Sequence, residues 1–247
     1  MTLNVLSLFA GIGGLELSLE RAGMTVVGQV EIDPFCRRVL ENHWPDVPKH
    51  DDVRTAVQWW ESEPRPDVEL ICGGFPCQPF SHAGQHLGVA DERWGWPWMR
   101  DVIDAVRPSY VVVENVPPLL RDVEAFSAVL SDLSDLRFDA DWDVVSACSL
   151  GAPHTRRRLF LVAYPDGGDG ISRMGSVGQR SQPVSSDDSG SGAWRDRVDW
   201  ALQTASRDDR NADGLSVQMV QSLGNAVVTQ VSEYIGTQLL QTIGAEA

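Results

Sequence analysis

Short apolar segments alternate along this sequence with segments of helical pattern, and this alternation limits the fold more than any other feature. The pattern predicts strands at 3–9, 24–32, 67–74, 109–116, 141–148 and 158–163. It predicts helices at 15–22, 34–42, 53–61, 96–107 and 118–131. Strands that alternate with helices form mostly parallel sheets, because each helix returns the chain to the start of the next strand. We therefore predict an α/β fold with a Rossmann-like, mostly parallel sheet and helices on both faces.

The composition changes after Pro165. Residues 166–214 are rich in Gly, Ser, Asp and Arg, and contain six Arg against nine Asp. Few aliphatic side chains are present to bury, so we predict a small, poorly structured insert there. Regular structure is expected to resume near Leu215, with a helix over 225–243. The predicted domains are residues 1–165, the insert at 166–214 and a C-terminal segment at 215–247.

Several classes of protein are excluded by composition. No apolar run approaches the roughly 18 residues of a membrane span, and the N-terminus lacks the basic segment and cleavage site of a signal peptide. We therefore expect a cytoplasmic protein without a membrane partner. The four cysteines include no CxxC pair and the five histidines have no metal-ligand spacing, so neither a disulfide framework nor a metal site is predicted.

The net charge is −15, from 35 acidic and 20 basic residues. On charge alone this opposes a nucleic-acid partner, because phosphate binding requires basic surface. Only one of the basic residues is a lysine, Lys49. A GC-rich genome, which favours Asp and Arg codons, and adaptation to a salt-rich cytoplasm both account for this acidity.

A glycine-rich sequence, FAGIGG at 9–14, follows the first predicted strand and opens a helix. Such a turn lets the backbone approach a ligand, and the helix N-terminus favours an anionic group. Glu31 and Asp33 end the next strand about 20 residues later, where an acid can bind ribose hydroxyls. Asp52 adds a carboxylate near a further strand end. An adenosine-containing cofactor is indicated and NAD is not excluded, although a structural glycine turn and a helix cap at Asp52 remain alternatives.

The sequence GGFPCQPFS at 73–81 lies at the carboxyl end of a predicted strand, the edge where ligands bind in open α/β sheets. Cys77 lies between two prolines, which restrict the loop and suit a positioned nucleophile. The alternative of a buried structural cysteine fits Cys72, inside the strand, much better than Cys77.

Glu114 ends the strongly apolar strand 109–116. Partial desolvation there would raise its pKa toward that of a proton donor, and the alternative is a cap on the following helix. Arg156 and Arg158 are two residues apart, so on an extended segment they point the same way. They are candidates to hold a phosphate or a carbonyl oxygen, and the alternative is a solvated basic stretch.

Seven short segments of this sequence resemble, in their residues and in their order, the motifs of the cytosine-C5 DNA methyltransferase family. From the N-terminus they are FAGIGG, EID, DDV, GGFPCQPFS, ENV, HTRRR and LGNAVV. The resemblance spans about residues 4–163 and 215–240. It implies methyl transfer from S-adenosylmethionine, with S-adenosylhomocysteine as product and no metal, to a flipped-out cytosine in double-stranded DNA. It also implies a restriction-modification context, a monomer, a catalytic domain at 1–165, target recognition by 166–214 and a C-terminal helix that returns to the catalytic domain.

The resemblance also implies roles for individual residues that match the family's motifs. Cys77 would attack cytosine C6, and Glu114 would hydrogen-bond N3 and the exocyclic amine, which favours protonation at N3. Arg158, together with Arg156, would orient O2 of the base and stabilise the cysteine side. The residues implied in cofactor binding are Phe9, Gly11, Gly13, Gly14, Glu31, Ile32, Asp52, Pro76, Trp96, Asn225 and Val227. The residues implied in DNA contact are Gln78, Ser81 and Arg93.

Three features depart from the family pattern. His154 replaces the usual glutamine, the motif that normally precedes GNAVV is not recognisable, and 166–214 is shorter than the usual recognition region. Two alternatives therefore stay open. One is a degenerate member that binds DNA or cofactor without turnover, and the other is an RNA cytosine-C5 methyltransferase that uses the same site.

Overall fold

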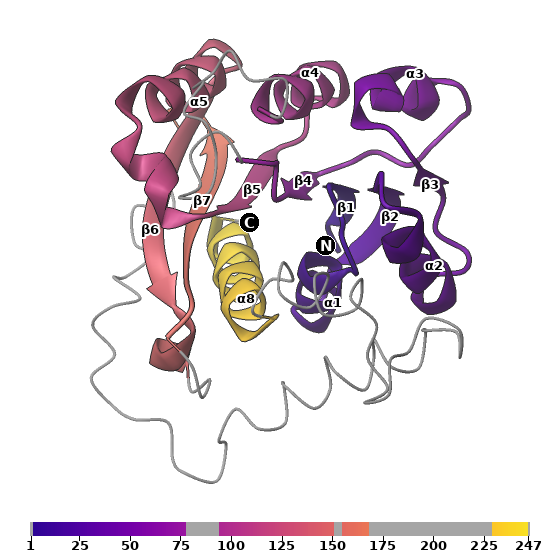
Figure 1. Cartoon of the computed structure of the whole chain (residues 1–247), viewed down its shortest axis with the longest axis horizontal. Coiled ribbons are helices and arrows are strands. Elements are labelled where there is room, and N and C mark those ends of the chain that lie inside the picture. The colour runs from indigo at the N-terminus through magenta and orange to yellow at the C-terminus, as the bar shows by residue number, and fades with distance from the viewer. Residues whose placement is uncertain (1, 78–93, 151–154, 168–228, 247) are drawn as a thin grey trace, which may run out of the picture.

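The computed structural model describes residues 2–77, 94–150, 155–167 and 229–246. Within these ranges a seven-stranded sheet has the order β3-β2-β1-β4-β5-β7-β6 (Figure 1). The strands are β1 Asn4–Leu8, β2 Thr25–Val30, β3 Lys49–His50, β4 Leu70–Gly73, β5 Tyr110–Asn115, β6 Phe138–Ser146 and β7 Arg157–Pro165. The α-helices are α1 Gly14–Arg21, α2 Pro34–His43, α3 Ala56–Glu61, α4 Trp96–Val106, α5 Val123–Asp135 and α8 Thr229–Glu246. Three short 3₁₀ helices are η1 Val53–Thr55, η4 Pro117–Arg121 and η5 Ala147–Leu150.

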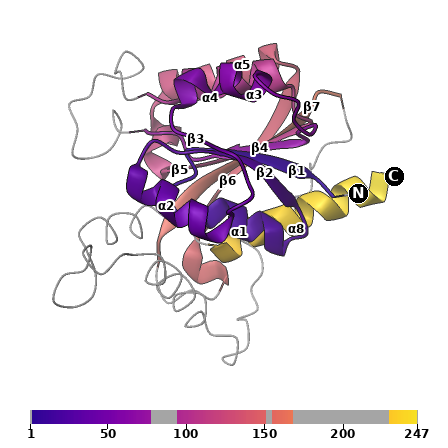
Figure 2. The same ribbon diagram turned by 90° about the vertical axis from the view of Figure 1, so that its right-hand side faces the viewer.

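Helices cover both faces of the sheet. α3, α4 and α5 lie on one face, and α1, α2 and α8 lie on the other (Figure 2). Strands β3, β2, β1, β4 and β5 are parallel, whereas β7 runs antiparallel to both β5 and β6. The predicted α/β class with a mostly parallel sheet is therefore confirmed. No helix in the described ranges has the length and apolar character needed to cross a bilayer.

The boundaries show where sequence reasoning was wrong. The predicted strand 141–148 instead spans Phe138–Ser146, because its pairing with β7 extends from Ser146 back to Phe138. The predicted helix 118–131 is divided, because two prolines form η4 and the carboxylate of Asp122 then caps α5 at Ala125 N. Helix 53–61 is likewise divided into η1 and α3. β3 was missed because it has only two residues. Residues 168–228, and with them most of the predicted insert, lie outside the described residues.

The core fills both sides of the central strands. On β1, Leu6 and Leu8 join the cluster under α3, α4 and α5, whereas Val5 joins the cluster that contains residues of α1 and α8. α8 packs closely on α1, since a Cβ at Gly236 would lie 3.0 Å from Leu19 Cδ2. The C-terminal helix thus closes the face that holds the first helix.

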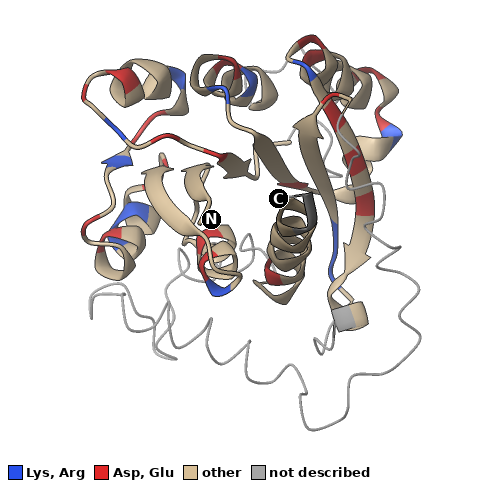
Figure 3. Ribbon diagram, turned by 180° about the vertical axis from the view of Figure 1, so that it is seen from behind, with Lys and Arg blue, Asp and Glu red and all other residues tan. Residues whose placement is uncertain are grey.

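β6 forms one edge of the sheet and carries acidic side chains (Figure 3). Asp139, Asp141 and Asp143 alternate with other residues, so they share one face of the strand. Trp142 points to the opposite face, where its ring packs edge-on against Phe126 of α5 at 5.1 Å between centroids.

The strand order reverses between β1 and β4. From β1 the chain proceeds outward to β2 and β3, and it then crosses to β4 and β5 on the other side. In open α/β sheets the crevice at such a reversal binds ligands beyond the carboxyl ends of the strands. The loops after Leu8 and after Gly73 both emerge there.

Gly73 permits the close approach of these two strands, because a Cβ at this position would lie 2.5 Å from the Leu8 carbonyl oxygen. We expect Gly73→Ala to lower the free energy of unfolding by about 1–3 kcal/mol through overpacking against backbone. Urea unfolding measures this change. Gly244→Ala is the control, since a Cβ there meets nothing within 4 Å. Equal stability of Gly73→Ala and the wild type would contradict the packing argument.

Candidate active site

The loop after β1 has a left-handed backbone at three positions. Gly11 and Gly13 have φ of 58° and 87°, and Phe9 has φ of 55°. A non-glycine residue in this region costs about 1–2 kcal/mol, so the surrounding structure must hold Phe9 in place. Ala10 N donates to Val30 O at 3.0 Å, which fixes the loop to β2. A Cβ at Gly11 would meet nothing within 4 Å, so this side of the loop is open.

Glu31 connects this loop to the end of β2. Its Oε2 accepts a hydrogen bond from Gly11 N at 2.6 Å, and its Oε1 accepts one from Asp33 N at 2.7 Å. Each carboxylate oxygen therefore keeps acceptor capacity for a ligand. Burial raises the pKa of Glu31, whereas these two hydrogen bonds and the charge of Arg37 lower it.

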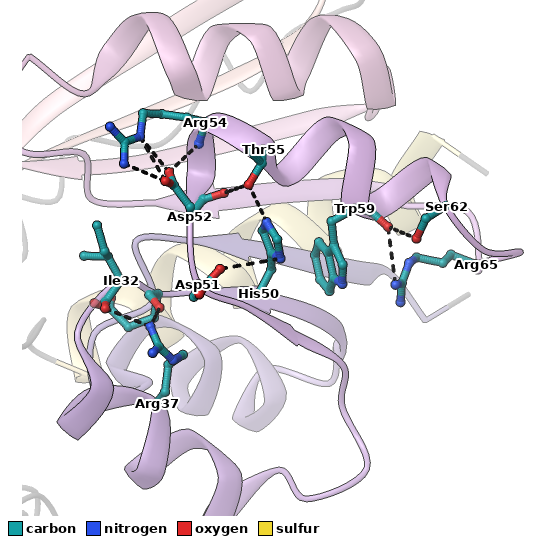
Figure 4. Close-up of polar contacts among 11 residues, drawn as sticks. Ile32, Arg37, His50, Asp51, Asp52, Arg54, Thr55, Trp59, Ser62 and Arg65 are labelled. Carbon is teal, nitrogen blue, oxygen red and sulfur yellow. Dashed lines mark hydrogen bonds and ion pairs between the residues drawn. The ribbon is translucent and has the colours of Figure 1, made fainter.

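Ile32 presents an apolar side chain beside Glu31, with 67% of its surface exposed. Asp33 begins α2 as its N-cap, because its carboxylate accepts hydrogen bonds from Phe35 N and Cys36 N. Figure 4 shows Arg37 of α2 reaching back toward Ile32. Polar and apolar groups are thus fixed side by side at the end of β2.

Asp52 follows β3 and is engaged by Arg54 (Figure 4). The Asp52 carboxylate accepts Arg54 N at 2.9 Å, which caps η1, and also pairs with the Arg54 guanidinium at 2.6 Å. The side-chain hydrogen bonds from Arg54 lower the pKa of Asp52. The capping role that we left open is therefore observed. Asp52 has this capping role and still lies at the same edge of the sheet as Glu31.

Pro76 lies in the loop that carries Cys77, whereas Trp96 lies in the core at the start of α4. Gly95 N donates to Pro76 O at 3.2 Å, so Pro76 lies where the cysteine loop meets the start of α4. The Trp96 side chain is 1% exposed, and its Nε1 donates to Asp132 Oδ2 at 2.7 Å. This gives Trp96 a place in the core beside Phe75, so its part in closing a cofactor pocket stays a prediction. Five further candidates, Gln78, Ser81, Arg93, Asn225 and Val227, lie outside the described residues.

Cys77 lies in the loop after β4 and forms an isolated antiparallel bridge with Trp94. The residue is 8% exposed. Burial, assisted by the negative charge of Asp122, raises the pKa of the Cys77 thiol to about 12. The thiol is thus protonated at neutral pH in this state of the protein. Cys72 is buried inside β4, as the structural alternative predicts.

Glu114 ends β5 and pairs with an arginine of the neighbouring strand. Arg158 Nε lies 2.8 Å from Glu114 Oε1. Burial raises the pKa of Glu114, and the charges of Arg158 and Arg156 oppose this rise. Glu114 does not cap the following helix, since η4 begins at Pro117 and its N-cap residue is Val116, with no side-chain cap. Arg158 is not a solvated side chain either, because only 21% of it is exposed.

Two neighbours hold Glu114 against the cysteine loop. A Cβ at Gly74 would lie 3.1 Å from Glu114 Oε2, so glycine leaves room for the carboxyl group. Asn115 Nδ2 donates to Phe75 O at 3.2 Å, which ties β5 to the loop that carries Cys77. Asn115 was missed, because a strand-end asparagine gives no sequence signal of which loop it contacts.

The arrangement can support acid and nucleophile chemistry. No group of three or more His, Cys, Asp or Glu side chains suited to a metal ion occurs among the described residues. The glycine loop, Glu31, Ile32 and Asp52 lie at the carboxyl ends of β1, β2 and β3. The Cys77 loop follows β4, and Glu114 lies at the carboxyl end of β5.

Comparison with known proteins gives one family. Residues 3–180 match the model of the C-5 cytosine-specific DNA methylases. The type II methyltransferase M2.BsuMI of Bacillus subtilis (strain 168) is 35% identical over 168 residues, which cover 65% of this chain and 42% of the relative. The type II methyltransferase M.AquIA of Picosynechococcus is 28% identical over 201 residues, covering 74% of this chain and 77% of the relative.

A solved structure is also similar. A prophage-encoded protein of E. coli, described as a DNA modification methyltransferase, superposes with a TM-score of 0.57 at 27% identity. The match covers 66% of this chain and 47% of that one. The chain thus spans less than half the length of this structure and of the B. subtilis relative.

Glu16 is a further site-proximal residue that sequence reasoning missed. It lies in the first turn of α1, directly after the glycine loop, and it is 0% exposed. The nearby polar side chains of Ser7 and Gln29 are also fully buried. Burial is the largest cause that raises the pKa of Glu16 to about 7, and the charge of Glu31 adds to it. One sequence signal could have revealed Glu16. It is an acidic residue between Leu15 and Leu19, on the helix face that packs on the sheet.

The raised pKa of Glu16 predicts a pH dependence of stability. Between the ordinary value of 4.5 and about 7, the folded protein keeps a proton that the unfolded chain has released. The free energy of unfolding therefore falls as pH rises through this range. Glu16→Gln removes that loss, so we expect it to be more stable than the wild type at about pH 8 by about 3 kcal/mol.

Urea unfolding at about pH 5.5 and about pH 8 measures this difference. Glu61→Gln, an exposed change on α3, is the control and should keep the pH slope of the wild type. An unchanged slope in Glu16→Gln would show that Glu16 is not the group responsible.

Proposed function

The chain belongs to the C-5 cytosine-specific DNA methylase family, and from this premise we propose that it methylates C5 of cytosine in double-stranded DNA with S-adenosylmethionine as methyl donor. The observation that carries the proposal is the meeting of two strand ends. β4 and β5 are hydrogen-bonded neighbours, and they bring the Cys77 loop beside Glu114 and Arg158. The protein is a candidate modification methyltransferase, as its type II relatives are named.

The residues at the ends of β1, β2 and β3 fit the cofactor. Each oxygen of Glu31 already accepts one backbone hydrogen bond and can accept another, which suits the two hydroxyls of a ribose. The exposed side chain of Ile32 offers an apolar surface to an adenine ring. The acceptor-only carboxylate of Asp52 suits the adenine amino group.

The open side of Gly11, with Gly13 and Gly14, would face the methionine part. Phe9 would flank the adenine from the β1 side. When bound, S-adenosylmethionine would supply an electrophilic methyl group. The chain's own residues would position it and keep it apart from bulk water.

Activation of the base would fall to Cys77 and Glu114. A cytosine in the duplex is shielded by stacking, so the base must leave the helix to reach a buried thiol. The Cys77 thiol would release its proton to water as its sulfur forms a bond to C6, and Glu114 would donate a proton to N3 as negative charge develops in the ring. C5 then has enamine character and becomes nucleophilic. After C5 is methylated, its proton would pass to water and the N3 proton would return to Glu114, so that Cys77 leaves as a thiolate and the aromatic ring is restored.

Burial prepares both groups for this sequence. The raised pKa of Glu114 favours the protonated form that can donate to N3. The raised pKa of Cys77 keeps the thiol protonated, and therefore weakly reactive, before a base is bound. Arg158 would contact O2 of the base while it remains close to Glu114, and Arg156 would add positive charge on the same side.

The activity is tested by incubating the protein with labelled S-adenosylmethionine and mixed-sequence duplex DNA over a salt series. Methylated cytosines are then mapped at base resolution. The salt series matters because DNA affinity falls steeply with salt concentration. Transfer to tRNA instead of duplex DNA would favour the RNA alternative. Bound cofactor without transfer at any salt concentration would favour the degenerate alternative.

Cys77→Ser is expected to abolish methylation, because a serine hydroxyl is a much weaker nucleophile than a thiolate. Its affinity for S-adenosylhomocysteine, measured by calorimetry, should stay within about threefold of the wild type, since Cys77 is assigned to the base and not to the cofactor. Cys148→Ser, which changes an exposed cysteine, is the control and should keep full activity. A large loss of cofactor binding in Cys77→Ser would refute this division of roles.

Glu114→Gln is expected to slow methyl transfer by at least about 100-fold at neutral pH, because an amide cannot supply the proton to N3. Single-turnover kinetics with saturating DNA measures the effect. Glu124→Gln, an exposed change in the first turn of α5, serves as control. Turnover near that of the wild type in Glu114→Gln would exclude the proton-donor role.

A further inference from the structure

Arg37 is a positively charged residue of α2 that donates hydrogen bonds to backbone carbonyl groups outside its own helix. It lies in the first half of α2, and its Nη1 donates to the backbone carbonyls of both Glu31 and Ile32, each at 2.8 Å (Figure 4). Among the described residues no carboxylate lies within ion-pair distance of its guanidinium. The charge of Arg37 is thus directed at the peptide groups that follow β2.

These peptide groups lie at the point where the hydrogen bonds between β2 and the neighbouring strands end. β2 ends at Val30, and the last hydrogen bond to its neighbour is from Glu31 N to His50 O of β3, at 3.0 Å. Beyond this point the backbone turns into the N-cap of α2 at Asp33. Hydrogen bonds from a charged donor are about twice as strong as neutral ones. Arg37 therefore fixes the turn that carries the side chains of Glu31 and Ile32.

The same cation balances the charges around Glu31. Glu31 and Glu16 of α1 repel each other, and the charge of Asp33 on the turn also acts against ionisation of Glu31. The backbone N–H of Glu31 donates to His50 O of β3. Arg37 is the positive group among these neighbours, and it favours the ionised form of the Glu31 carboxyl.

From these contacts we propose that Arg37 is a positioning residue of the cofactor site, which holds Glu31 and Ile32 in the geometry that receives the ribose and adenine of S-adenosylmethionine. The inference rests on the proposed function. Arg37 itself touches no cofactor atom in this assignment. It acts through the backbone turn and through the charge of Glu31.

The proposal predicts an effect on binding and on its pH profile. Arg37→Gln should weaken the binding of S-adenosylhomocysteine about tenfold at about pH 7.5, because two charge-assisted hydrogen bonds and a neighbouring cation are lost. The ionised Glu31 carboxylate accepts the ribose hydroxyls, so affinity falls when pH drops through the pKa of Glu31. Loss of the cation raises that pKa, so the fall in affinity should begin at higher pH in Arg37→Gln than in the wild type.

Calorimetric titration of the full chain with S-adenosylhomocysteine, from about pH 4.5, the ordinary pKa of a glutamate, to about pH 8.5, measures both effects. Arg37→Lys keeps the charge and should restore a pH profile close to that of the wild type. Arg38→Gln is the matched control, because it removes the same charge from the next residue of α2, which donates to Pro34 O instead. Thermal melts of each variant are recorded in parallel.

A double-mutant cycle separates action through Glu31 from a general loss of structure. In a Glu31→Gln background, Arg37→Gln should no longer move the pH profile, because the titrating group is absent. Equal affinities and equal profiles for Arg37→Gln and the wild type would overturn the inference, as would an identical loss in Arg38→Gln. If the wild type itself does not bind S-adenosylhomocysteine, both the inference and the proposed cofactor fail. A wild type that binds, together with an Arg37→Gln variant that binds equally well, removes only the inference.

Discussion

The Glu31 carboxylate joins the loop after β1 to the turn after β2. Its two oxygens accept the backbone N–H groups of Gly11 and Asp33, so the glycine loop and the turn before α2 share one anchor. This anchor adds to the hydrogen bond from Ala10 N to Val30 O, and together they hold the left-handed backbone of the loop. The proposed ribose acceptor is therefore also a structural part of the loop. Its cofactor role depends on the second lone pair of each oxygen.

Burial and charge oppose each other at two carboxyl groups of the site. Burial is the largest cause that raises the pKa of Glu31 and of Glu114, whereas the charge of Arg37 lowers the first and the charge of Arg158 lowers the second. At Cys77 burial raises the pKa of the thiol without a cation to oppose it. A carboxyl group with a raised pKa at the end of β5 agrees with the proposed donation of a proton to N3.

Much of the fold and several residues of the candidate site could be predicted from the sequence, for a physical reason. Apolar strands that end in polar residues place those residues at one edge of a parallel sheet, so Glu31, Cys77 and Glu114 could be located before the structure was known. Contacts that cross between elements could not. Arg158 was assigned to the substrate alone, and its pairing with Glu114 depends on the register of β5 with β7. Arg37 and Glu16 carry no motif, and only the packing of α1 and α2 shows which groups they face.

The acidic edge strand has a consequence for the protein in solution. An edge strand offers unpaired backbone groups that can pair with another chain. On β6, a second copy in the same position would place its own aspartates against Asp139, Asp141 and Asp143, and like charges at this spacing repel. The strand therefore protects the sheet from edge-to-edge aggregation while its carboxylates are ionised. The repulsion between whole chains is a separate effect, because it follows the net charge of −15 and disappears as the pH approaches the isoelectric point of about 4.6.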